Sequence, residues 1–413
     1  MTHFTRDSLA RLDQDDALSS FREQFDLEPG LIYLNGNSLG VLPKAAKARV
    51  AEVVEQEWGR GLIRSWNTHD WISLPERVGD KLATLIGAEA GEVVVADSTS
   101  VNLFKLAAAA VRMRPGRSKI VSEPGNFPTD LYILQGLEGF LEGEVRLETA
   151  PREQLKEIID EDTALVVLTH VHYKSGKMFD MAALTDRAHE VGALILWDLS
   201  HSAGAVPVEL NAVQADFAVG CGYKYLNGGP GAPGFLFVAK RHQAEFRQPL
   251  SGWFGHANPF AMSDVYEPAA GIKRGLCGTT GVLAASVLEV GVDIMASADM
   301  EAIRTKSRQL GDIFIELVEQ HCAGYGFTLV SPRDESLRGS QVSLAHEQGF
   351  AIMQALIARN IIGDFRAPDI LRFGFTPLYT RYVDLWDMVQ ALAEIMAREE
   401  WNRREFKKKL AVT

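Results

Sequence analysis

The sequence predicts an α/β fold, in which a mostly parallel sheet is flanked by helices and joined to a smaller C-terminal α+β domain. Between Gly91 and Val238, short apolar runs alternate with helical stretches, as in the strand–helix units of a parallel sheet. The apolar runs are nearly continuous, so the strands are expected to be covered on both faces. Two runs lead into ionisable residues, Asp198 and Lys224, which are therefore expected at one edge of the sheet.

Length and composition restrict the class of protein. A chain of 413 residues predicts two domains, or a large domain with a smaller companion. The net charge of −12 argues against nucleic acid and anionic membranes as partners, because both select basic surfaces. No run approaches the roughly 18 apolar residues of a membrane helix, and the acidic N-terminus lacks the apolar core of a signal peptide. The three cysteines, Cys221, Cys277 and Cys322, are far apart, which argues against a disulfide framework or a metal cluster and favours a reducing cytoplasm.

Residues 1–60 are expected to form an N-terminal segment that joins the small domain. Residues 7–25 predict a short amphipathic helix, and residues 44–58 predict a second helix. Between them, LIYLNGNSLG at residues 31–40 contains a cluster of turn-forming residues. The loop that follows the second helix, at residues 66–71, is rich in aromatic residues. It is either a packed surface loop or the wall of a pocket.

Residues 61–280 are expected to form the large domain. Its strands are predicted at the apolar runs Val93–Ala96, Ile120–Val121, Leu165–Leu168, Leu194–Trp197, Phe217–Val219 and Phe235–Val238. The helices between them are predicted at Val101–Met113, Asp130–Leu141, Arg152–Ile159 and Ala182–Val191.

Residues 281–413 are expected to form a linking helix and the small domain. One long helix is predicted at about Val282–Cys322. The remaining elements are predicted as strands at Phe327–Val330, Gln341–Leu344, Ile361–Asp364 and Ile370–Phe373 and as helices at Phe350–Arg359 and Val383–Glu399. The charged tail at residues 398–410 is expected to be a solvated helix end.

A group of small polar residues, Asp97-Ser98-Thr99-Ser100, stands between a predicted strand and a predicted helix. Free backbone N–H groups and hydroxyls at a helix start can bind an anion, but the same residues would also make an ordinary helix cap. The sequence has no GxxxxGK[ST] motif and no GxGxxG motif after a strand. An anion at this place is therefore not expected to be a nucleoside triphosphate or a dinucleotide.

Asp198 and Lys224, with His201 between them, suit pyridoxal phosphate. A carboxylate at the end of a buried strand is costly to desolvate unless it meets a cation, and the pyridinium nitrogen of this cofactor is such a cation. A lysine in a desolvated setting can attack the aldehyde of the cofactor. Phe127 could lie flat on the ring. The alternatives are a capping role for Asp198, a place at the edge of the core for His201, and an ordinary surface position for Lys224.

Arg372 lies between apolar residues in LRFGFTPLY, so its charge needs an anion. A guanidinium can bind the carboxylate of an amino-acid substrate through two parallel hydrogen bonds. A structural salt bridge is the alternative.

Segments spread over nearly the whole chain resemble the kynureninase family, within the pyridoxal-phosphate enzymes of the aspartate aminotransferase fold type (fold type I). The segments are YLNGNSLG (Tyr33–Gly40), DSTSVNLFK (Asp97–Lys105), NFPTD (Asn126–Asp130), WDLSHSAGAVP (Trp197–Pro207), GYKYLNGGPG (Gly222–Gly231), GWFGH (Gly252–His256) and GDFRAPDILRFGFTPLY (Gly363–Tyr379). The WDLxH and YKYLNxGPG motifs together strongly restrict the set of families that the chain can resemble. The last two segments restrict it further.

The resemblance implies roles for the matching residues. Lys224 would hold the cofactor aldehyde, and Asp198 would pair with the ring nitrogen beside His201. The phosphate of the cofactor would be bound by Thr99, Ser100, Tyr223 and the partner subunit's Trp253. Phe127 would cover the ring, and Asp130 and Thr169 would help to position it. Thr279 would also reach the site from the partner subunit. Arg372 would bind the substrate α-carboxylate, and Trp66 and Asn35 would contribute to the substrate site.

The resemblance also implies a reaction, the hydrolysis of L-kynurenine to anthranilate and L-alanine by a cytoplasmic homodimer with shared active sites. Lys224 would remove the Cα proton, and Tyr223 is the candidate proton relay. The choice between kynurenine and 3-hydroxykynurenine stays open, as does a role in tryptophan catabolism or in the supply of nicotinamide cofactors (NAD biosynthesis).

Three alternatives belong to other kinds of protein. A cysteine desulfurase or lyase needs a thiol on a mobile loop of the small domain, and neither Cys221 nor Cys322 is placed for that work. An aminotransferase could use the same lysine–aspartate pair. A non-catalytic pyridoxal-binding regulator would need an added DNA-binding domain, for which the acidic N-terminus leaves no room.

Overall fold

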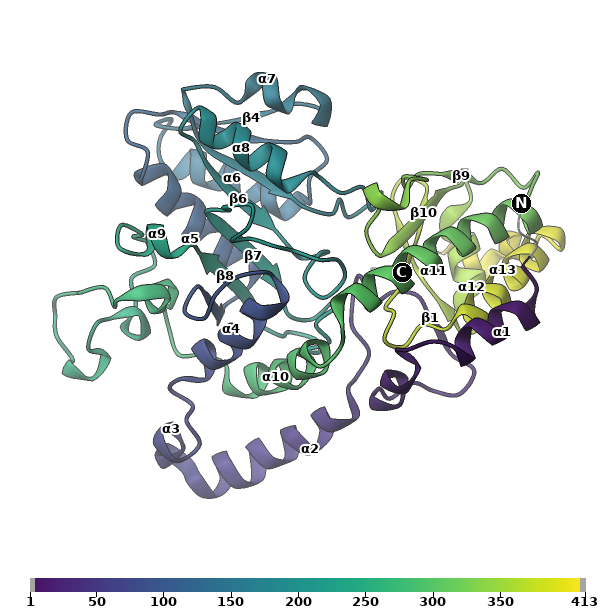
Figure 1. Ribbon diagram of the computed structural model, residues 1–413, viewed down its shortest axis with the longest axis horizontal. Coiled ribbons are helices and arrows are strands. Elements are labelled where there is room, and N and C mark those ends of the chain that lie inside the picture. The colour runs from purple at the N-terminus through teal and green to yellow at the C-terminus, as the bar shows by residue number, and fades with distance from the viewer. Residues whose placement is uncertain (1–3, 409–413) are drawn as a thin grey trace.

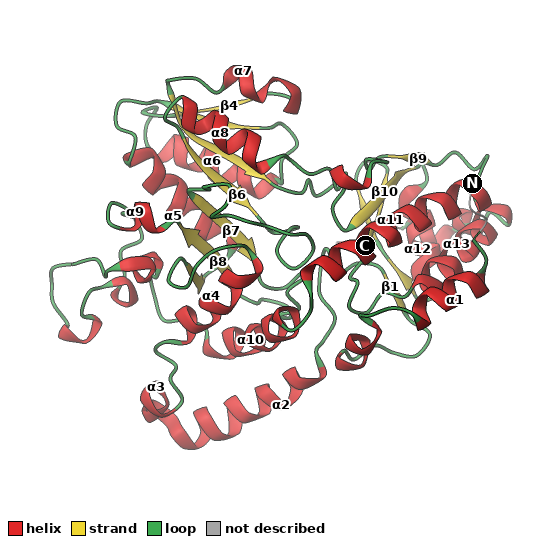
Figure 2. Ribbon diagram, viewed as in Figure 1, coloured by secondary structure: helices red, strands yellow, loops and turns green. Residues whose placement is uncertain are grey.

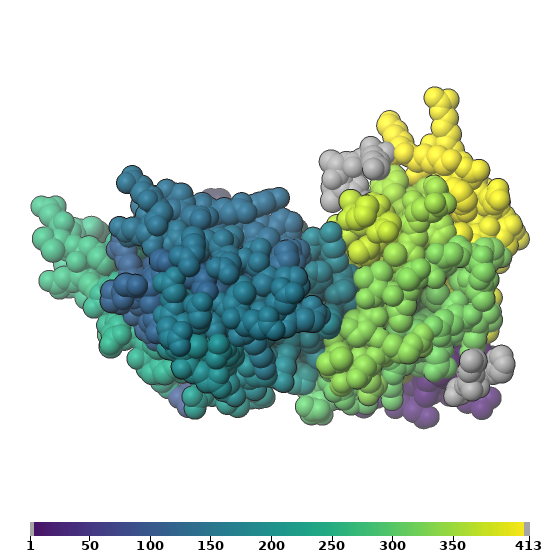
Figure 3. Space-filling view, turned by 90° about the horizontal axis from the view of Figure 1, so that it is seen from above, coloured from purple at the N-terminus to yellow at the C-terminus, as the bar shows by residue number. Residues whose placement is uncertain are grey.

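The computed structural model describes residues 4–408 and contains two lobes. Figure 1 shows the two lobes side by side. The large lobe, at the left, contains the large sheet and its helices, and the small lobe, at the right, contains fewer strands and the helices α1 and α13, which lie beside each other. In Figure 3 the blue and teal residues of the large lobe meet the light green residues of the small lobe along a broad contact. None of the helices in the described part of the chain is long and apolar enough to cross a membrane.

The large lobe contains the mixed, mostly parallel sheet that the sequence predicts. Its seven strands lie in the order β2 (Val93–Ala96), β8 (Gly234–Val238), β7 (Phe217–Cys221), β6 (Leu194–Asp198), β5 (Thr163–Thr169), β3 (Lys119–Ser122) and β4 (Arg146–Thr149). Strand β8 runs antiparallel to both of its neighbours, and all other pairs are parallel. Strand β4 was not predicted, because its residues RLET are polar and partly exposed at the edge of the sheet.

Helices cover both faces of this sheet, as Figure 2 shows. Alternate residues of β6 enter two separate cores, with Ile195 and Trp197 in one and Leu194 and Leu196 in the other. The helices of this lobe are α4 (Leu74–Leu85), α5 (Thr99–Arg112), α6 (Pro128–Phe140), α7 (Leu155–Ile158), α8 (Met181–Glu190), α9 (Lys240–Gln243) and α10 (Val282–Ala296). The predicted coverage of both faces is confirmed.

The prediction of one long helix at Val282–Cys322 is wrong. The chain forms α10 and then a separate helix, α11 (Met300–His321), with a break at residues 297–299. Asp299 begins the second helix, because its side chain accepts a hydrogen bond from the backbone N–H of Glu301 at 3.0 Å. A capping residue inside an apolar pattern therefore separates two helices that periodicity alone joins.

The small lobe contains a four-stranded antiparallel sheet in the order β12 (Asp364–Arg366), β13 (Ile370–Gly374), β10 (Gln341–Ala345) and β9 (Thr328–Leu329). The strand predicted at Ile361–Asp364 is divided. Its first part, β11 (Ile361–Ile362), pairs in parallel with β1 (Ile32–Tyr33) of the N-terminal segment, and its second part belongs to β12. The N-terminal segment is thereby fixed to the small lobe.

The remaining helices end at other residues than the sequence predicts. Helix α1 (Arg6–Gln14) is followed by a 3₁₀ turn at Ser19–Gln24, and α2 (Lys44–Glu52) continues as a π-helix at Val53–Gly61. The small lobe also contains the helices α12 (Gly349–Ile357) and α13 (Tyr382–Ala397). A short helix, α3 (Ser65–Thr68), lies in the aromatic loop. The predicted solvated tail forms 3₁₀ turns as far as residue 407, and residues 409–410 lie outside the described part of the chain.

Candidate functional site

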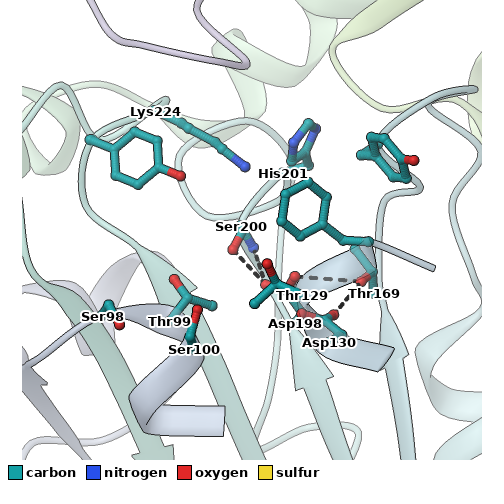
Figure 4. Close-up of a pocket in the computed structure, with 13 residues that line it drawn as sticks. Ser98, Thr99, Ser100, Thr129, Asp130, Thr169, Asp198, Ser200, His201 and Lys224 are labelled. Atoms are coloured by element: carbon teal, nitrogen blue, oxygen red, sulfur yellow. Dashed lines mark hydrogen bonds between the residues drawn. The ribbon is translucent and has the colours of Figure 1, made fainter. Parts of the chain in front are cut away.

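A cavity of about 280 Å³ opens where β5 and β6 end and α5 begins. Figure 4 shows the side chains that surround it, with Lys224 facing Asp198 across the space. The lining residues are Ser98, Thr99, Ser100, Phe127, Thr129, Asp130, Thr169, Tyr173, Asp198, Ser200, His201, Tyr223 and Lys224. Nine of the cofactor-site residues named from the sequence thus lie around one cavity. They come together because parallel strands bring their carboxyl ends to the same edge of the sheet.

Two buried carboxylates form the floor of the cavity. Asp198 ends β6 beside Thr169 of β5, and its Oδ1 accepts hydrogen bonds from the backbone N–H and the hydroxyl of Ser200 at 2.8 and 2.6 Å. The Thr169 hydroxyl lies 3.1 Å from Asp130 Oδ2 and 3.4 Å from Asp198 Oδ2. Burial, together with the nearby charge of Asp198, raises the pKa of Asp130 well above its usual range. The neutral form of Asp130 is therefore favoured beside Asp198.

Lys224 lies on the opposite side of the cavity and is buried. Its Nζ is 5.6 Å from the ring centre of Phe127 and 5.8 Å from that of Tyr223. It forms no ion pair with any residue in the described part of the chain. Burial first, and then the charge of Cys221 and Asp198, raises the pKa of Tyr223 above its usual value, so its hydroxyl keeps its proton. The cavity thus holds an amine and a phenol above a carboxylate.

The N-terminal segment packs directly against the chain at Lys224. The backbone N–H of Gly40 donates to the Tyr223 carbonyl at 2.8 Å. A Cβ atom on Gly40 would lie 2.4 Å from the Lys224 carbonyl oxygen and 2.7 Å from Asn227 Cα, so only glycine fits between these backbones. The turn cluster in LIYLNGNSLG therefore packs against the backbone that carries Lys224.

Replacing Gly40 with alanine is expected to lower the free energy of unfolding by about 2 kcal/mol or more, because the backbone at Lys224 has to move. Chemical denaturation of purified protein measures this change. Gly136→Ala in α6 is the matched control, since a Cβ there meets no atom within 4 Å. Alanine at that helical position should stabilise the protein by about 0.5–1 kcal/mol. Equal stability of the two variants would contradict the packing described for Gly40.

The start of α5 forms the third side of the cavity. Ser98 is the capping residue, and its hydroxyl accepts from the backbone N–H of Val101 at 3.4 Å. Thr99 and Ser100 follow in the first turn, where backbone N–H groups have no partner inside the helix. Behind them, the buried Lys105 amine pairs with Asp97 and donates to the Gly275 carbonyl. Ser98 is therefore the cap, and the next two residues line the cavity, where their helix start could receive an anion.

Arg372 does not line the cavity but lies next to one of its walls. Its Nη1 donates to the Tyr173 carbonyl at 2.7 Å, and its Nη2 donates to the Ser38 hydroxyl at 2.7 Å. Its Nε donates to Asp364 Oδ1 at 2.8 Å, and its Nη2 also reaches Asp364 Oδ2. Burial by itself would raise the pKa of Asp364, but the hydrogen bond and charge of Arg372 outweigh burial and lower it. The Arg372 guanidinium thus forms a structural salt bridge with Asp364, which is the alternative that the sequence left open.

Besides Arg372, four of the residues named from the sequence lie outside the cavity. Trp66 packs against Trp71 and Phe254, and Asn35 bridges to Gly374 of β13. Trp253 and Thr279 lie on loops at the surface of the large lobe. Trp253 is 37% exposed, beside the still more exposed Phe260. Thr279 lines a separate cavity of about 220 Å³.

Sequence reasoning missed several residues that shape the site. Thr129, Tyr173 and Ser200 line the cavity, and Gln341 and Asp364 hold His201 and Arg372 from the small lobe. Thr129 and Ser200 lie inside segments that the sequence had already singled out. Asp364 also lies inside such a segment, eight residues before Arg372. No local signal marks Gln341, because its neighbours in space come from distant parts of the chain.

Comparison with known proteins extends these observations. Residues 303–392 match the family model described as the kynureninase C-terminal domain. Over 415 aligned positions, a protein named kynureninase from Burkholderia pseudomallei (strain 1106a) is 55% identical, with 99% of this chain and all of the relative covered. A kynureninase from Pseudomonas fluorescens is 54% identical over the same extent.

Solved structures with low sequence identity share the fold. A cysteine desulfurase from Thermococcus onnurineus NA1 matches with a TM-score of 0.78 at 20% identity, covering 92% of this chain and 98% of that one. A C-DES variant with glycine covalently linked to its PLP cofactor matches with a TM-score of 0.78 at 16% identity, covering 90% and 99%. These proteins are fold type I enzymes, which confirms the predicted fold class.

Proposed function

The chain belongs to the kynureninase family, and from this premise we propose that its cavity hydrolyses L-kynurenine to anthranilate and L-alanine. It is a pyridoxal-phosphate-dependent hydrolase, as the identity of 55% over the whole chain indicates. The observation that carries the proposal is the cavity in which Lys224 faces Asp198, with the start of α5 beside them. The cysteine desulfurases share only the fold at this level of identity.

The residues of the cavity fit pyridoxal phosphate. The floor has one charged carboxylate, Asp198, which is 2% exposed and has no cationic partner within hydrogen-bond distance in the described part of the chain. A protonated ring nitrogen is the cation that such a carboxylate needs. The first turn of α5 suits the phosphate, and the unpaired Lys224 amine suits the aldehyde. When bound, the cofactor supplies an electron sink for negative charge at the substrate Cα.

Each residue then has one task. Asp198 keeps the ring nitrogen protonated, and Phe127 covers the ring. With substrate bound, the free Lys224 amine could take the proton from the substrate Cα and hold it for a later protonation. After water has added to the γ-ketone and the Cβ–Cγ bond has broken, Tyr223, which keeps its own proton, could donate it to the β-carbon that stays with alanine. Arg372 binds the substrate α-carboxylate. Trp66 and Asn35 lie outside the cavity of their own chain, so their proposed contribution is to the outer part of the substrate site.

We propose that Arg372 exchanges one of its present partners for the substrate carboxylate. Arg372→Lys is expected to raise KM for kynurenine about 100-fold, because lysine cannot form two parallel hydrogen bonds. The inhibition constant of the decarboxylated substrate analogue should stay the same in this variant. Steady-state kinetics with both compounds measures the difference. A parallel loss for both compounds would mean that Arg372 acts only through its salt bridge to Asp364.

We propose that the enzyme is a homodimer in which the partner subunit's Trp253 and the partner subunit's Thr279 complete each cavity. Both residues lie away from the cavity of their own chain, and the loop of Trp253 exposes Phe260, Met262 and Val265. Exposed apolar side chains concentrated on one loop are typical of an interface between subunits.

Mixing two inactive variants tests this arrangement. Lys224→Ala and Trp253→Ala chains, unfolded together and refolded, should recover about a quarter of the wild-type activity, because half of the dimers are hybrids with one intact site. Each variant refolded alone is the control. No recovery in a sample whose hybrids are verified by mass spectrometry would place Trp253 in the site of its own chain or outside the site.

The proposed reaction is tested by incubating the cofactor-loaded enzyme with L-kynurenine in the absence of any keto acid. Anthranilate and alanine should form in equal amounts. An aminotransferase would need the keto acid and would release no anthranilate, so that result would overturn the proposal. Kinetic constants for kynurenine and 3-hydroxykynurenine, measured side by side, decide which substrate is preferred.

We also propose a cytoplasmic location and a role in tryptophan catabolism. The location is supported by the three cysteines, which are all unpaired. The division into an N-terminal segment (1–60), a large cofactor domain (61–280) and a small domain (281–413) completes the proposal.

A further inference from the structure

A buried hydrogen-bond network joins the cavity to the small lobe. Gln341, on β10, is 1% exposed and contacts three separate parts of the chain. Its Nε2 lies 3.1 Å from the Tyr173 carbonyl and 3.4 Å from the Lys174 carbonyl. Its Oε1 lies 3.2 Å from Asn37 Nδ2 and 3.3 Å from His201 Nδ1. One amide thus connects the N-terminal segment, the small lobe and a residue that lines the cavity.

The chemistry of these contacts fixes the orientation of the Gln341 amide. Backbone carbonyls only accept hydrogen bonds, so the NH₂ group must face Tyr173 and Lys174. The amide oxygen must then face Asn37 and His201, and an oxygen can only accept from them. His201 therefore carries its proton on Nδ1. The neutral ring is favoured because burial, followed by the charges of Lys224 and Arg372, lowers the pKa of His201 well below its usual value.

The surroundings are shaped for this amide. A Cβ on Gly176 would lie 2.8 Å from Gln341 Cγ, and a Cβ on Gly374 would lie 2.1 Å from Asn37 Oδ1. The absence of a side chain at both glycines therefore makes room for Gln341 and Asn37. The Tyr173 carbonyl also accepts from Arg372, so the network reaches the residue assigned to the substrate carboxylate.

We propose that Gln341 is a positioning residue that holds His201 in the Nδ1–H form, so that His201 Nε2 is a hydrogen-bond acceptor at the cofactor cavity. Gln341 touches neither the cofactor cavity nor the proposed substrate and acts through His201. The same amide holds the Tyr173 carbonyl beside Arg372. The network therefore positions both His201, at the cofactor cavity, and Arg372, which is assigned to the substrate carboxylate. The consequence for catalysis rests on the proposed function, whereas the state of His201 does not.

The test is the position of the His201 proton in cofactor-loaded enzyme labelled with ¹⁵N-histidine, read from the nitrogen shifts in long-range ¹H–¹⁵N spectra. The signals of His201 are identified by their loss in His201→Gln. Wild-type enzyme should show a proton on Nδ1 alone. Gln341→Met, which has a similar shape but no acceptor oxygen, should shift the population toward Nε2–H. Its dissociation constant for the cofactor should rise about 10- to 100-fold, because a buried donor loses its partner.

Gln243→Met is the matched control. The Gln243 amide also donates to two backbone carbonyls, of Gly91 and Val238, but it lies far from the cavity lining. It should leave the His201 signals and the cofactor affinity unchanged. If Gln341→Met does not fold, Gln341→Leu replaces it, since leucine also lacks an acceptor for Nδ1–H and should likewise shift the population toward Nε2–H.

A proton on Nε2 in the wild type, or unchanged signals and cofactor affinity in Gln341→Met, would overturn the proposal for Gln341. The same spectra recorded on the enzyme without cofactor give the state of His201 independently. If the enzyme fails to hydrolyse kynurenine, the proposed function falls, but the spectra still decide the role of Gln341.

Discussion

Lys224→Ala is expected to lower kcat/KM for kynurenine hydrolysis at least about a thousandfold, because the variant loses the group that holds the cofactor and moves the Cα proton. Lys224 is the lysine whose buried amine faces the cavity without an ion-pair partner in the described part of the chain. The variant should keep the fold of the wild type, since no salt bridge is lost. Anthranilate fluorescence gives the activity, and thermal unfolding monitors the fold.

Lys224→Arg is the matched control for this prediction. It keeps the positive charge but has no primary amine, so its activity should fall about as far as that of the alanine variant. A small primary amine added to Lys224→Ala should restore part of the activity, and it should do nothing for Lys224→Arg, where the guanidinium fills the space. An arginine variant with near wild-type activity would show that the charge of Lys224, and not its amine, is what the reaction needs.

Asp198→Asn is expected to lower kcat about 100- to 1,000-fold, because removing one partner of a buried ion pair costs about 3–5 kcal/mol. Asparagine keeps the shape of the side chain and can still accept from the Ser200 hydroxyl. The lost quantity is the negative charge that keeps the ring nitrogen protonated. Steady-state kinetics at saturating cofactor measures kcat without a contribution from weaker cofactor binding.

Asp130→Asn is the matched control for Asp198→Asn. Burial and the neighbouring Asp198 raise the pKa of Asp130 well above its usual range, so the neutral form of this carboxyl is favoured and asparagine imitates it. Its kcat should fall about tenfold or less, which corresponds to one altered hydrogen bond. If Asp130→Asn lost as much as Asp198→Asn, both carboxylates would be charged in the enzyme, and the assignment of the floor charge to Asp198 would be wrong.

Much of the cavity could be predicted from the sequence because local patterns encode it. Asp198 ends an apolar run that can only be a buried strand, and the pleat places it beside Thr169 of the neighbouring strand. The turn before α5 is also local, since Ser98 caps the helix two residues after strand β2 ends at Ala96. Motif resemblance then supplied the family, which the comparisons confirm.

The parts that sequence reasoning missed depend on contacts between distant segments. Arg372 was expected to need an anion, and Asp364 supplies it from only eight residues earlier, but the contacts of Arg372 with Ser38 and with the Tyr173 carbonyl come from distant segments that no local pattern reveals. Gln341 reaches His201 over 140 residues of sequence. The break between α10 and α11 was missed for a different reason, because Asp299 caps a helix within an uninterrupted periodic pattern.

The central claim is that pyridoxal phosphate is held by Lys224 in the cavity above Asp198. Reduction of the cofactor-loaded enzyme with borohydride, followed by proteolysis and mass spectrometry of the peptides, tests it most directly. The reduced cofactor should be found on the peptide that contains Lys224 and on no other lysine. A label on a different lysine, or no label on protein that carries bound cofactor, would contradict the account.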